Sequence, residues 1–443
     1  MSRSINTFYI ENLGCAKNQV DAEILVKLLE DEGWVYSDRP DNAGIIIVNS
    51  CGFIREAKEE SIQSVIDLRA HYPGRKIVLT GCLAQRYGRS LENTLPEVEG
   101  IVGNGAPEKV RDFILAVSEG GGGVEIPSPS PRFPRRNRLL SYPGSVYVKI
   151  AEGCSNRCSY CAIPDIRGDF ASRSHQKVID EIKGYLQRGI REFILLAQDL
   201  GSYGKDLGEP AYLKKLLSEI SSLKEDFWVR LLYIHPDHFP EGILDICAAD
   251  SRILRYFDLP FQHASKGVLE KMSRSGDSES YLRLLTRIRK RLPGVFIRST
   301  FLVGFPGETE EDFKELLEFQ KQARIDWLGV FTYSREEGTP AYRMENRFSH
   351  RRLHKKALRR KEIVESEQEK ITAERLEGLV GTKQEVLIEE QFRGQDLFLG
   401  RGYFQAPDVD GLMVVRGRDL SPGSAAQCLV TKRVGVDLEG QAL

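Results

Sequence analysis

Short apolar runs alternate with longer amphipathic stretches over the first 119 residues of the chain. The runs predict strands at 7–11, 45–49 and 76–80, and the stretches predict helices at 20–31, 56–68 and 84–87. Strands and helices that alternate in this way are typical of a parallel, doubly wound sheet. We therefore expect an N-terminal α/β domain over residues 1–125.

The same alternation returns between residues 140 and 375. Six further strands are predicted, at 146–151, 193–197, 229–234, 255–259, 295–303 and 328–333, with helical stretches such as 178–188 and 312–323 between them. Six βα units predict a partial (βα)6 barrel, whose functional site is expected at the rim formed by the carboxyl ends of its strands.

The pattern changes in three other segments. Residues 120–140 are rich in Gly, Pro and Arg and predict a linker without regular structure. Residues 350–377 predict a largely exposed helix, and its basic start at 351–361 is either a nucleic-acid contact or an ordinary solvated face. Short glycine-punctuated strands at 384–388, 397–400, 412–415 and 427–430 predict a small β-barrel over residues 378–443.

Composition narrows the class of protein. The 443 residues include 63 Lys and Arg against 64 Asp and Glu, a net charge of -1, which excludes a protein that holds nucleic acid by bulk positive charge. No apolar run approaches the ~20 residues of a membrane helix, and residues 1–6 lack the apolar core of a signal peptide. We expect a soluble, cytoplasmic protein with no membrane partner.

Three of the eight cysteines stand at equivalent places in the N-terminal domain. Cys15, Cys51 and Cys82, here called the rim triad, each follow a predicted strand. Ligands bind at the carboxyl ends of strands in open α/β sheets, so the three thiols are expected to converge there. Clustered cysteines in a reducing compartment usually bind metal or act in catalysis. The alternative is three buried structural cysteines.

Three more cysteines stand on one loop after the first barrel strand. Cys154, Cys158 and Cys161, here called the barrel triad, have the spacing C-x3-C-x2-C. A structural zinc site needs four ligands, and no fourth Cys or His stands nearby. Thiolates at this spacing suit an iron–sulfur cluster in which one iron stays open for a substrate or cofactor.

This loop, together with the rim triad, resembles the radical S-adenosylmethionine (SAM) methylthiotransferases over the whole chain. Four stretches resemble the RimO type within that family, and the C-terminal barrel resembles a TRAM domain whose 406–411 loop also has the RimO form. The four stretches are 161–173, the segment around Ala197-Gln198-Asp199, 259–265 and 298–309. The resemblance implies methylthiolation of an aspartate of small-subunit ribosomal protein S-twelve at its β-carbon.

The resemblance also implies cofactors and partners. The barrel triad would hold a 4Fe-4S cluster that binds SAM, and the rim triad a second 4Fe-4S cluster that delivers sulfur. Tyr160, Gln198, Asp199 and Gly304 would contact SAM, although Tyr160 could equally be a core aromatic residue. The expected partners are the ribosomal protein, free or in the ribosome, a reduced flavodoxin-like electron donor and a sulfur donor.

Two other functions remain possible at this stage. A methylthiotransferase acting on a tRNA adenosine would share all six cysteines, and a non-enzymatic iron–sulfur carrier or regulator would need no barrel. Residues 378–443 carry seven basic and nine acidic side chains, which suits a basic protein partner better than a phosphate backbone. Asp408 and Asp410, in the 406–411 loop, are therefore expected to face the substrate.

Overall fold

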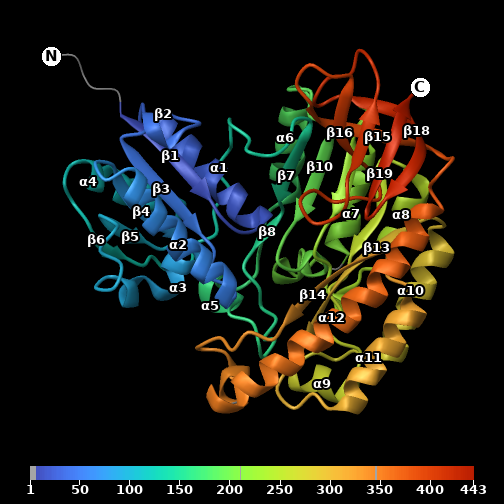
Figure 1. The fold of residues 1–443 in the computed structure, drawn as a ribbon. Coiled ribbons are helices and arrows are strands. Elements are labelled where there is room, and N and C mark those ends of the chain that lie inside the picture. The colour runs from blue at the N-terminus through green and yellow to red at the C-terminus, as the bar shows by residue number, and fades with distance from the viewer. Residues whose placement is uncertain (1–5, 210, 345–346) are drawn as a thin grey trace.

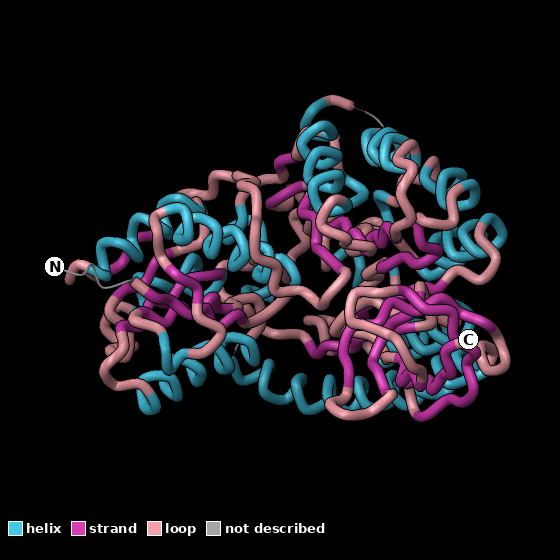
Figure 2. Tube along the Cα trace, turned by 90° about the horizontal axis from the view of Figure 1, so that it is seen from above, coloured by secondary structure: helices cyan, strands magenta, loops and turns pink. Residues whose placement is uncertain are grey.

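The computed structural model describes residues 6–209, 211–344 and 347–443, which fold into three parts (Figure 1). An α/β domain, a central partial barrel and a small closed β-barrel follow one another along the chain, and the first and last lie at opposite ends of the molecule (Figure 2). Residues 1–5, part of the segment considered for a signal peptide, lie outside the described residues. Within those residues, no helix has the length and apolar character needed to cross a membrane.

The N-terminal sheet is parallel, as predicted, with strand order β2-β1-β3-β4-β5-β6. Two faces of apolar residues bury it between helices, with Ile45 and Ile47 packing to one side and Ile46 and Val48 to the other. The elements are β1 Thr7–Asn12, α1 Ala16–Asp31, β2 Val35–Tyr36, η1 Pro40–Asn42, β3 Ile45–Ser50, α2 Arg55–His71, β4 Lys76–Gly81, α3 Cys82–Leu91, β5 Gly100–Val102, α4 Pro107–Ser118 and β6 Gly123–Glu125.

The expectation of a linker without regular structure over 120–140 is wrong in one place and holds for the residues after it. Gly123–Glu125 forms β6, because Val124 pairs with Ile101 of β5 and packs on the apolar face beside it. Further on, Arg136 is buried and forms ion pairs with Glu23 of α1 and Glu181 of the barrel. This segment therefore holds the first two parts of the molecule together.

The central part is an open, parallel sheet of six strands in the order β14-β13-β12-β11-β10-β7, which confirms the six predicted strands. Its elements are β7 Ser145–Lys149, β8 Ala151–Glu152, α5 Ile163–Arg167, β9 Ala171–Ser172, α6 His175–Leu186, β10 Glu192–Leu196, η2 Leu200–Ser202, η3 Lys205–Leu207, α7 Tyr212–Ser221, β11 Trp228–Leu231, η4 Pro236–His238, α8 Ile243–Ala249, β12 Ile253–Asp258, α9 Lys266–Lys271, α10 Ser278–Arg291, β13 Phe296–Val303, α11 Glu310–Ala323, β14 Trp327–Thr332 and η5 Pro340–Met344.

Alternate residues of these strands point to opposite faces of the sheet. Val146, Phe193 and Leu195 pack outward against the helices. Tyr147 and Ile194 point inward, where α1 and the C-terminal barrel share one apolar cluster with them. The interior of the partial barrel is thus covered by the other two parts of the chain.

Helix α12, Arg347–Glu377, is less exposed than its many charged residues predict. Ala357, Val364, Ile371 and Leu376 recur at helical spacing and are buried. The helix lies along the edge of the sheet beside β14 and leads into the C-terminal barrel (Figure 1). Of its basic residues, Lys356 and Arg360 form ion pairs with Glu310, and a nucleic-acid contact at the basic start of the helix stays a prediction.

The C-terminal part is a closed barrel of five strands, one more than predicted. The added strand, β19, returns parallel to β17 and closes the barrel, a pairing that no local signal in the sequence shows. The strands are β15 Lys383–Gln391, β16 Leu397–Gly402, β17 Met413–Arg416, β18 Ala425–Val434 and β19 Asp437–Ala442.

Buried charges attach this small barrel to the central sheet. Glu192 forms ion pairs with Arg230 of β11 and Arg401 of β16. Asp410 was expected to face the substrate, but its side chain is 0% exposed and pairs with Arg298 of β13 at 2.6 Å. That expectation is wrong because the 406–411 loop turns toward the strands and not toward solvent, while Asp408 does remain exposed.

Candidate functional site

The rim triad lies where the sequence places it. Cys15 precedes α1, Cys51 directly follows β3 and Cys82 begins α3, so all three stand beyond the carboxyl ends of neighbouring parallel strands. Cys15 is exposed, Cys51 is half-buried and Cys82 is buried. The exposure of the three free thiols therefore decreases from Cys15 through Cys51 to Cys82.

Two glycines beside these cysteines allow the loops to meet. A Cβ on Gly14 would lie 2.9 Å from the Cβ of Cys51, and a Cβ on Gly52 would lie 2.6 Å from the backbone of Leu83. Any larger residue would push neighbouring loops apart. The Cys15 loop therefore contacts the Cys51 loop, and the Cys51 loop contacts the start of α3 at Cys82 and Leu83.

Asn18 of α1 fixes this arrangement by hydrogen bonds. Its amide nitrogen donates to the carbonyls of Leu13 and Ser50, each at 3.0 Å, which are in the loops of Cys15 and Cys51. Its amide oxygen lies 3.3 Å from the Cys82 sulfur, which donates to it. One buried side chain thus connects all three cysteine loops.

The barrel triad lies on the loop between β8 and α5, at the carboxyl end of β7. The Cys154 amide donates to the carbonyl of Gly168 and the Cys161 amide to that of Cys158, both at 3.0 Å. Ser159, between them, donates from its backbone to Met272 and from its hydroxyl to Lys271. The loop is therefore anchored to the segment after α9, which keeps the three thiols on one side of the barrel.

Burial raises the pKa of four of the six thiols and makes them poor thiolates without a metal: Cys51, Cys82, Cys154 and Cys161. Burial, with a smaller contribution from the neighbouring Cys82 and Cys15, raises the pKa of Cys51 to about 11. Burial also raises the pKa of Cys154 to about 11 and that of Cys161 to about 12, and in both cases Cys158 adds to the rise. The thiols of each triad are therefore close enough to act on one another, and coordination to iron would deprotonate them.

The donor set suits a cluster better than a single ion. In the described ranges, no three His, Cys, Asp or Glu side chains lie close enough together to share one metal ion. A four-iron cluster binds each thiolate at a different iron and so accepts thiols that are further apart. By donor chemistry, each triad offers three thiolates to such a cluster, which would leave one iron free of protein.

The loops that carry the two triads meet at the junction of the first two parts. Cys82 packs against Ala162, which directly follows the barrel triad, and against Ile166 of α5. On the Cys15 side, the Lys17 ammonium lies 3.3 Å from the ring centroid of Tyr233 at the end of β11. Glu336 of the barrel closes another part of the junction, where it accepts from Lys58 and Arg86.

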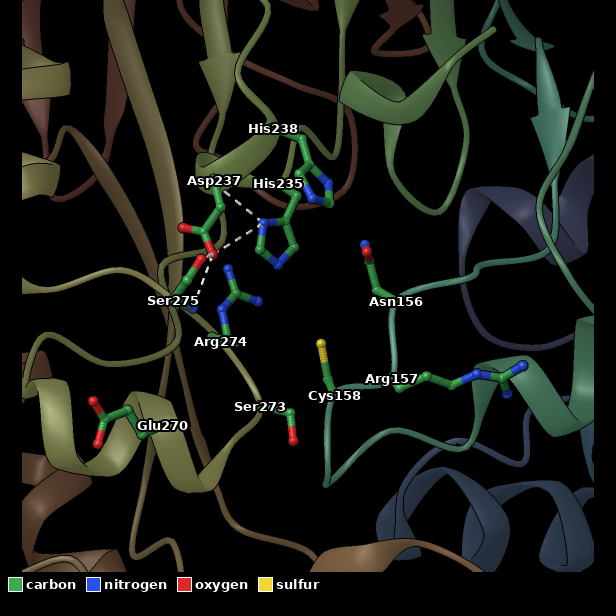
Figure 3. Close-up of a pocket in the computed structure, with 10 residues that line it drawn as sticks. All are labelled: Asn156, Arg157, Cys158, His235, Asp237, His238, Glu270, Ser273, Arg274 and Ser275. Carbon is green, nitrogen blue, oxygen red and sulfur yellow. Dashed lines mark hydrogen bonds and ion pairs between the residues drawn. The ribbon is translucent and has the colours of Figure 1, made fainter. Parts of the chain in front are cut away.

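A cavity of about 510 Å³ opens at the carboxyl-end rim beside Cys158 (Figure 3). His235, Asp237 and His238 line it from the loop after β11, and Arg274 lines it from the segment after α9. Asp237 accepts from the backbone and hydroxyl of Ser275, at 3.1 and 2.9 Å. Burial and the charge of Arg274 lower the pKa of His235 to about 3, so this imidazole is neutral at physiological pH.

Asp199 stands at the bottom of this side of the rim, directly after β10. Its carboxylate accepts from the His238 ring at 2.6 Å and from the Ser202 hydroxyl at 2.7 Å, as well as from Asn156 on the cysteine loop. Burial alone would raise the pKa of Asp199, but the hydrogen bonds from His238 and Ser202 hold it below its usual range. Both oxygens already have protein donors, so Asp199 orients His238 and the cysteine loop, and its predicted contact with SAM stays a prediction.

Gln198, unlike Asp199, has a buried polar atom that no protein group satisfies. Its amide nitrogen donates to Glu152 at 2.7 Å, while its amide oxygen is buried and has no hydrogen-bond partner. A buried acceptor without a partner costs about 1–3 kcal/mol, which a ligand donor would recover. Lys149 and Arg167 outweigh burial and lower the pKa of Glu152 to about 2, so the partner of Gln198 is an ionised carboxylate.

Tyr160 and Gly304 also have structural roles. Arg274 donates to the Tyr160 hydroxyl at 3.4 Å, and part of the Tyr160 ring packs on the barrel core. Gly304 has a positive φ of 77°, and a Cβ there would lie 2.3 Å from that of Ala357 on α12, so helix packing alone requires glycine. Their contacts with SAM remain predictions.

Sequence reasoning missed the residues that line the cavity from outside the cysteine loop. His235, Asp237, His238 and Arg274 are not close in sequence to either triad. The one available signal was the His-Pro-Asp-His run at 235–238, directly beyond a predicted strand, where polar rim residues are expected. Arg274 carried no signal, because its segment begins with a helix that only the fold brings back to the rim.

Comparison with known families covers all three parts of the chain. Residues 7–103 match the Uncharacterized protein family UPF0004, residues 148–319 match the Radical SAM superfamily and residues 380–443 match the TRAM domain. The matched regions correspond to the α/β domain, the partial barrel and the closed barrel.

Two relatives match over almost their whole length. The chain is 43% identical to a protein of Treponema denticola named ribosomal protein uS12 methylthiotransferase RimO, over 97% of this chain and 99% of that protein. It is 39% identical to the protein of the same name from Carboxydothermus hydrogenoformans, over 98% and 99% of the two chains.

Solved structures share the fold at low identity. TsrM from Kitasatospora setae, a radical S-adenosylmethionine methyltransferase with cobalamin and a 4Fe-4S cluster bound, matches 76% of this chain and 77% of its own, with a TM-score of 0.56 and 18% identity. The cobalamin-dependent S-adenosylmethionine radical enzyme OxsB matches 82% of this chain and 56% of its own, with a TM-score of 0.51 and 12% identity. At these identities the likeness shows the fold alone.

Proposed function

The chain belongs to the RimO family of ribosomal protein uS12 methylthiotransferases, and from this premise we propose that it attaches a methylthio group to an aspartate of uS12 at the β-carbon. The substrate class comes from the family, and the meeting of the two triad loops at the domain junction is the structural observation that supports the proposal. Two sets of three thiols, one on the α/β rim and one on the barrel rim, meet at Cys82 and Ala162. A substrate held between them would be within reach of both.

Each triad has one proposed role. Cys154, Cys158 and Cys161 would hold the 4Fe-4S cluster that binds SAM, and Cys15, Cys51 and Cys82 would hold the second 4Fe-4S cluster. When bound, these groups supply the radical that removes hydrogen from an unactivated carbon, the sulfur and, from a further SAM, the methyl group. No protein side chain can abstract such a hydrogen, which is why the chemistry requires cofactors.

The chain's own residues would position SAM and exclude water. Gln198 would accept from SAM with its unpartnered amide oxygen. Asp199 would hold His238 at the cavity wall, while Tyr160 would flank the adenine and Gly304 would lie against the adenosine. The neutral His235 and the cationic Arg274 line the cavity beside Cys158, where a substrate carboxylate or the carboxylate of SAM would find a positive partner.

The tRNA reading is less well supported. The relatives at 38–43% identity carry the uS12 name. The net charge of the C-terminal barrel does not discriminate between tRNA and uS12 as the substrate. Three of its charged residues are buried in ion pairs: Arg401, Glu389 and Asp410. That leaves six basic and seven acidic residues in the rest of residues 378–443, which is nearly neutral.

Two partners complete the proposal. One-electron reduction of the barrel cluster requires a donor, for which a reduced flavodoxin-like protein is suitable. Replacement of the inserted sulfur requires a sulfur donor. Both partners follow from the chemistry of the reaction.

The test uses the whole chain, reconstituted anaerobically with iron and sulfide and reduced chemically. The reconstituted protein is incubated with SAM and purified uS12, and the protein substrate is analysed by mass spectrometry. We expect uS12 to gain a methylthio group on one aspartate and 5′-deoxyadenosine to form. Unmodified tRNA is the matched alternative substrate, and modification of the tRNA in place of uS12 would overturn the proposal.

A further inference from the structure

Arg167 ends α5 in the barrel part, yet its guanidinium lies among the loops of the rim triad. One nitrogen, Nη2, donates to the Cys82 sulfur at 3.3 Å and to the Asn18 amide oxygen at 2.7 Å. The other, Nη1, donates to Asp21 of α1 at 2.6 Å. A side chain that follows the barrel triad by six residues therefore contacts the site of the other triad directly.

The position of Arg167 is closely constrained. Its side chain is 6% exposed, and Lys149 shares its two carboxylate partners, Asp21 and Glu152. Two cations and two carboxylates form this quartet, and among them Arg167 is the one that donates to a cysteine sulfur. The positive charge of Arg167 therefore acts on the Cys82 thiol through a contact from which water is largely excluded.

Asn18 extends the influence of Arg167 over the whole triad. The amide oxygen that accepts from Arg167 belongs to the side chain that ties the Cys15 and Cys51 loops together. Movement or loss of the guanidinium would therefore alter its contact with Cys82. It would also disturb Asn18, whose hydrogen bonds connect the three cysteine loops.

We propose that Arg167 is a positioning residue that raises the reduction potential of the cluster held by the rim triad. Reduction adds negative charge to a cluster, and a buried cation that donates to a ligand sulfur stabilises the reduced form. Hydrogen bonds from outside the ligand set commonly tune metal sites in this way. The barrel part of the chain would thereby set the redox state of the sulfur-delivering site. This inference rests on the proposed function for the cluster at the rim triad.

The experiment isolates that cluster. In the full chain with Cys154, Cys158 and Cys161 changed to Ala, the rim triad would carry the one remaining cluster, and its potential is measured by a redox titration followed by electron paramagnetic resonance. Arg167→Gln should lower the reduced-to-oxidised ratio at the parent's midpoint about tenfold, which is ~59 mV for one electron. Arg167→Lys keeps the charge and should shift the potential less.

Two further variants separate charge from structural damage. Asp21→Asn removes the carboxylate that offsets Arg167 and should shift the potential upward, opposite in sign to the shift expected for Arg167→Gln. Arg111→Gln, on α4, loses contacts to the surface carboxylates Asp112 and Glu32 and should leave the potential unchanged.

Each outcome bears on the inference. If Arg167→Gln loses the cluster, the upward shift in Asp21→Asn decides the case. Potentials for Arg167→Gln or Asp21→Asn that equal that of Arg111→Gln would overturn the role of Arg167 alone. Absence of iron from the parent with the intact rim triad would instead contradict the proposed function, so the two failures are distinguishable.

Discussion

Changing Asp410 to Asn should release the closed barrel from the central sheet. Asp410 pairs with Arg298 at 2.6 Å, accepts from the Tyr256 hydroxyl at 2.6 Å and accepts from the Ala406 amide at 2.8 Å. Asparagine keeps the shape and can still accept both neutral hydrogen bonds. The substitution therefore removes the charge and leaves Arg298 facing a neutral group.

The magnitude follows from burial. Removing one partner of a buried ion pair costs ~3–5 kcal/mol because the other charge stays buried without compensation. Arg298 is 14% exposed, so water can reach part of it, and we expect about 3 kcal/mol, the low end of that range. Asp408→Asn is the matched control, since Asp408 is exposed and accepts from Tyr142 at 2.9 Å, a contact worth ~0.5–1 kcal/mol.

Tryptophan fluorescence reports on this interface directly. Trp327 of β14 is buried and donates from its indole to the carbonyl of Phe404 at 2.7 Å. With Trp34 and Trp228 replaced by Phe, urea unfolding would follow this contact alone. A loss of about 3 kcal/mol at a urea dependence of ~1–3 kcal/mol per molar should lower the midpoint by ~1–3 M.

Equal midpoints for Asp410→Asn and Asp408→Asn would refute this account of the interface. A double variant gives a second check, because Arg298→Met together with Asp410→Asn removes both charges. The double variant should lose less unfolding free energy than the two single variants lose when their losses are added. Strictly additive losses would mean that the two side chains do not depend on each other.

Three other predictions concern the site. Changing the barrel triad to Ala should halve the iron of the reconstituted chain from about eight to about four atoms and abolish SAM cleavage, and any 5′-deoxyadenosine formed by that variant would contradict the assignment. Changing the rim triad to Ala should leave SAM cleavage intact but stop methylthiolation of uS12; a variant that still attaches sulfur at the parent rate would make the α/β domain structural only. Burial raises the pKa of Asp258 to about 6, so the folded state binds this proton more tightly than the unfolded state, and unfolding free energy should fall by up to ~1.4 kcal/mol per pH unit as pH rises toward 6. Asp258→Asn should flatten that slope in urea titrations between about pH 4 and 6, and the same slope in both proteins would exclude Asp258 as its source.

Local patterns were sufficient for the elements that bury a full strand or helix face. β3 is buried along its whole length and β13 along most of it, so their apolar runs stand out against their neighbours. β6 did not stand out, because a three-residue edge strand with two exposed positions leaves no apolar run to detect. The exposure of α12 was misjudged for a related reason, since four buried positions are diluted among many charged ones.

The residues of the candidate site also divide into those that local sequence patterns identify and those that only the fold places. The six cysteines were identifiable because their spacing and their place after strands are local properties of the chain. Asp410 and Asp408 are two residues apart in one loop, and no local pattern separates the buried one from the exposed one. Arg274 reaches the cavity only because α9 returns its segment to the rim.

By itself, the sequence determined the three-part architecture, the two thiol triads and the family, since strand alternation, cysteine spacing and motifs are written along the chain. Tertiary structure alone decided that Cys82 packs against the segment after the barrel triad, that Arg167 of one part donates to Cys82 of another, and that Asp410 pairs with Arg298 beneath the closed barrel. The physical reason is that hydrogen bonds and buried charge pairs depend on distances between residues far apart in sequence. Those distances exist only after the sheets, helices and loops have packed.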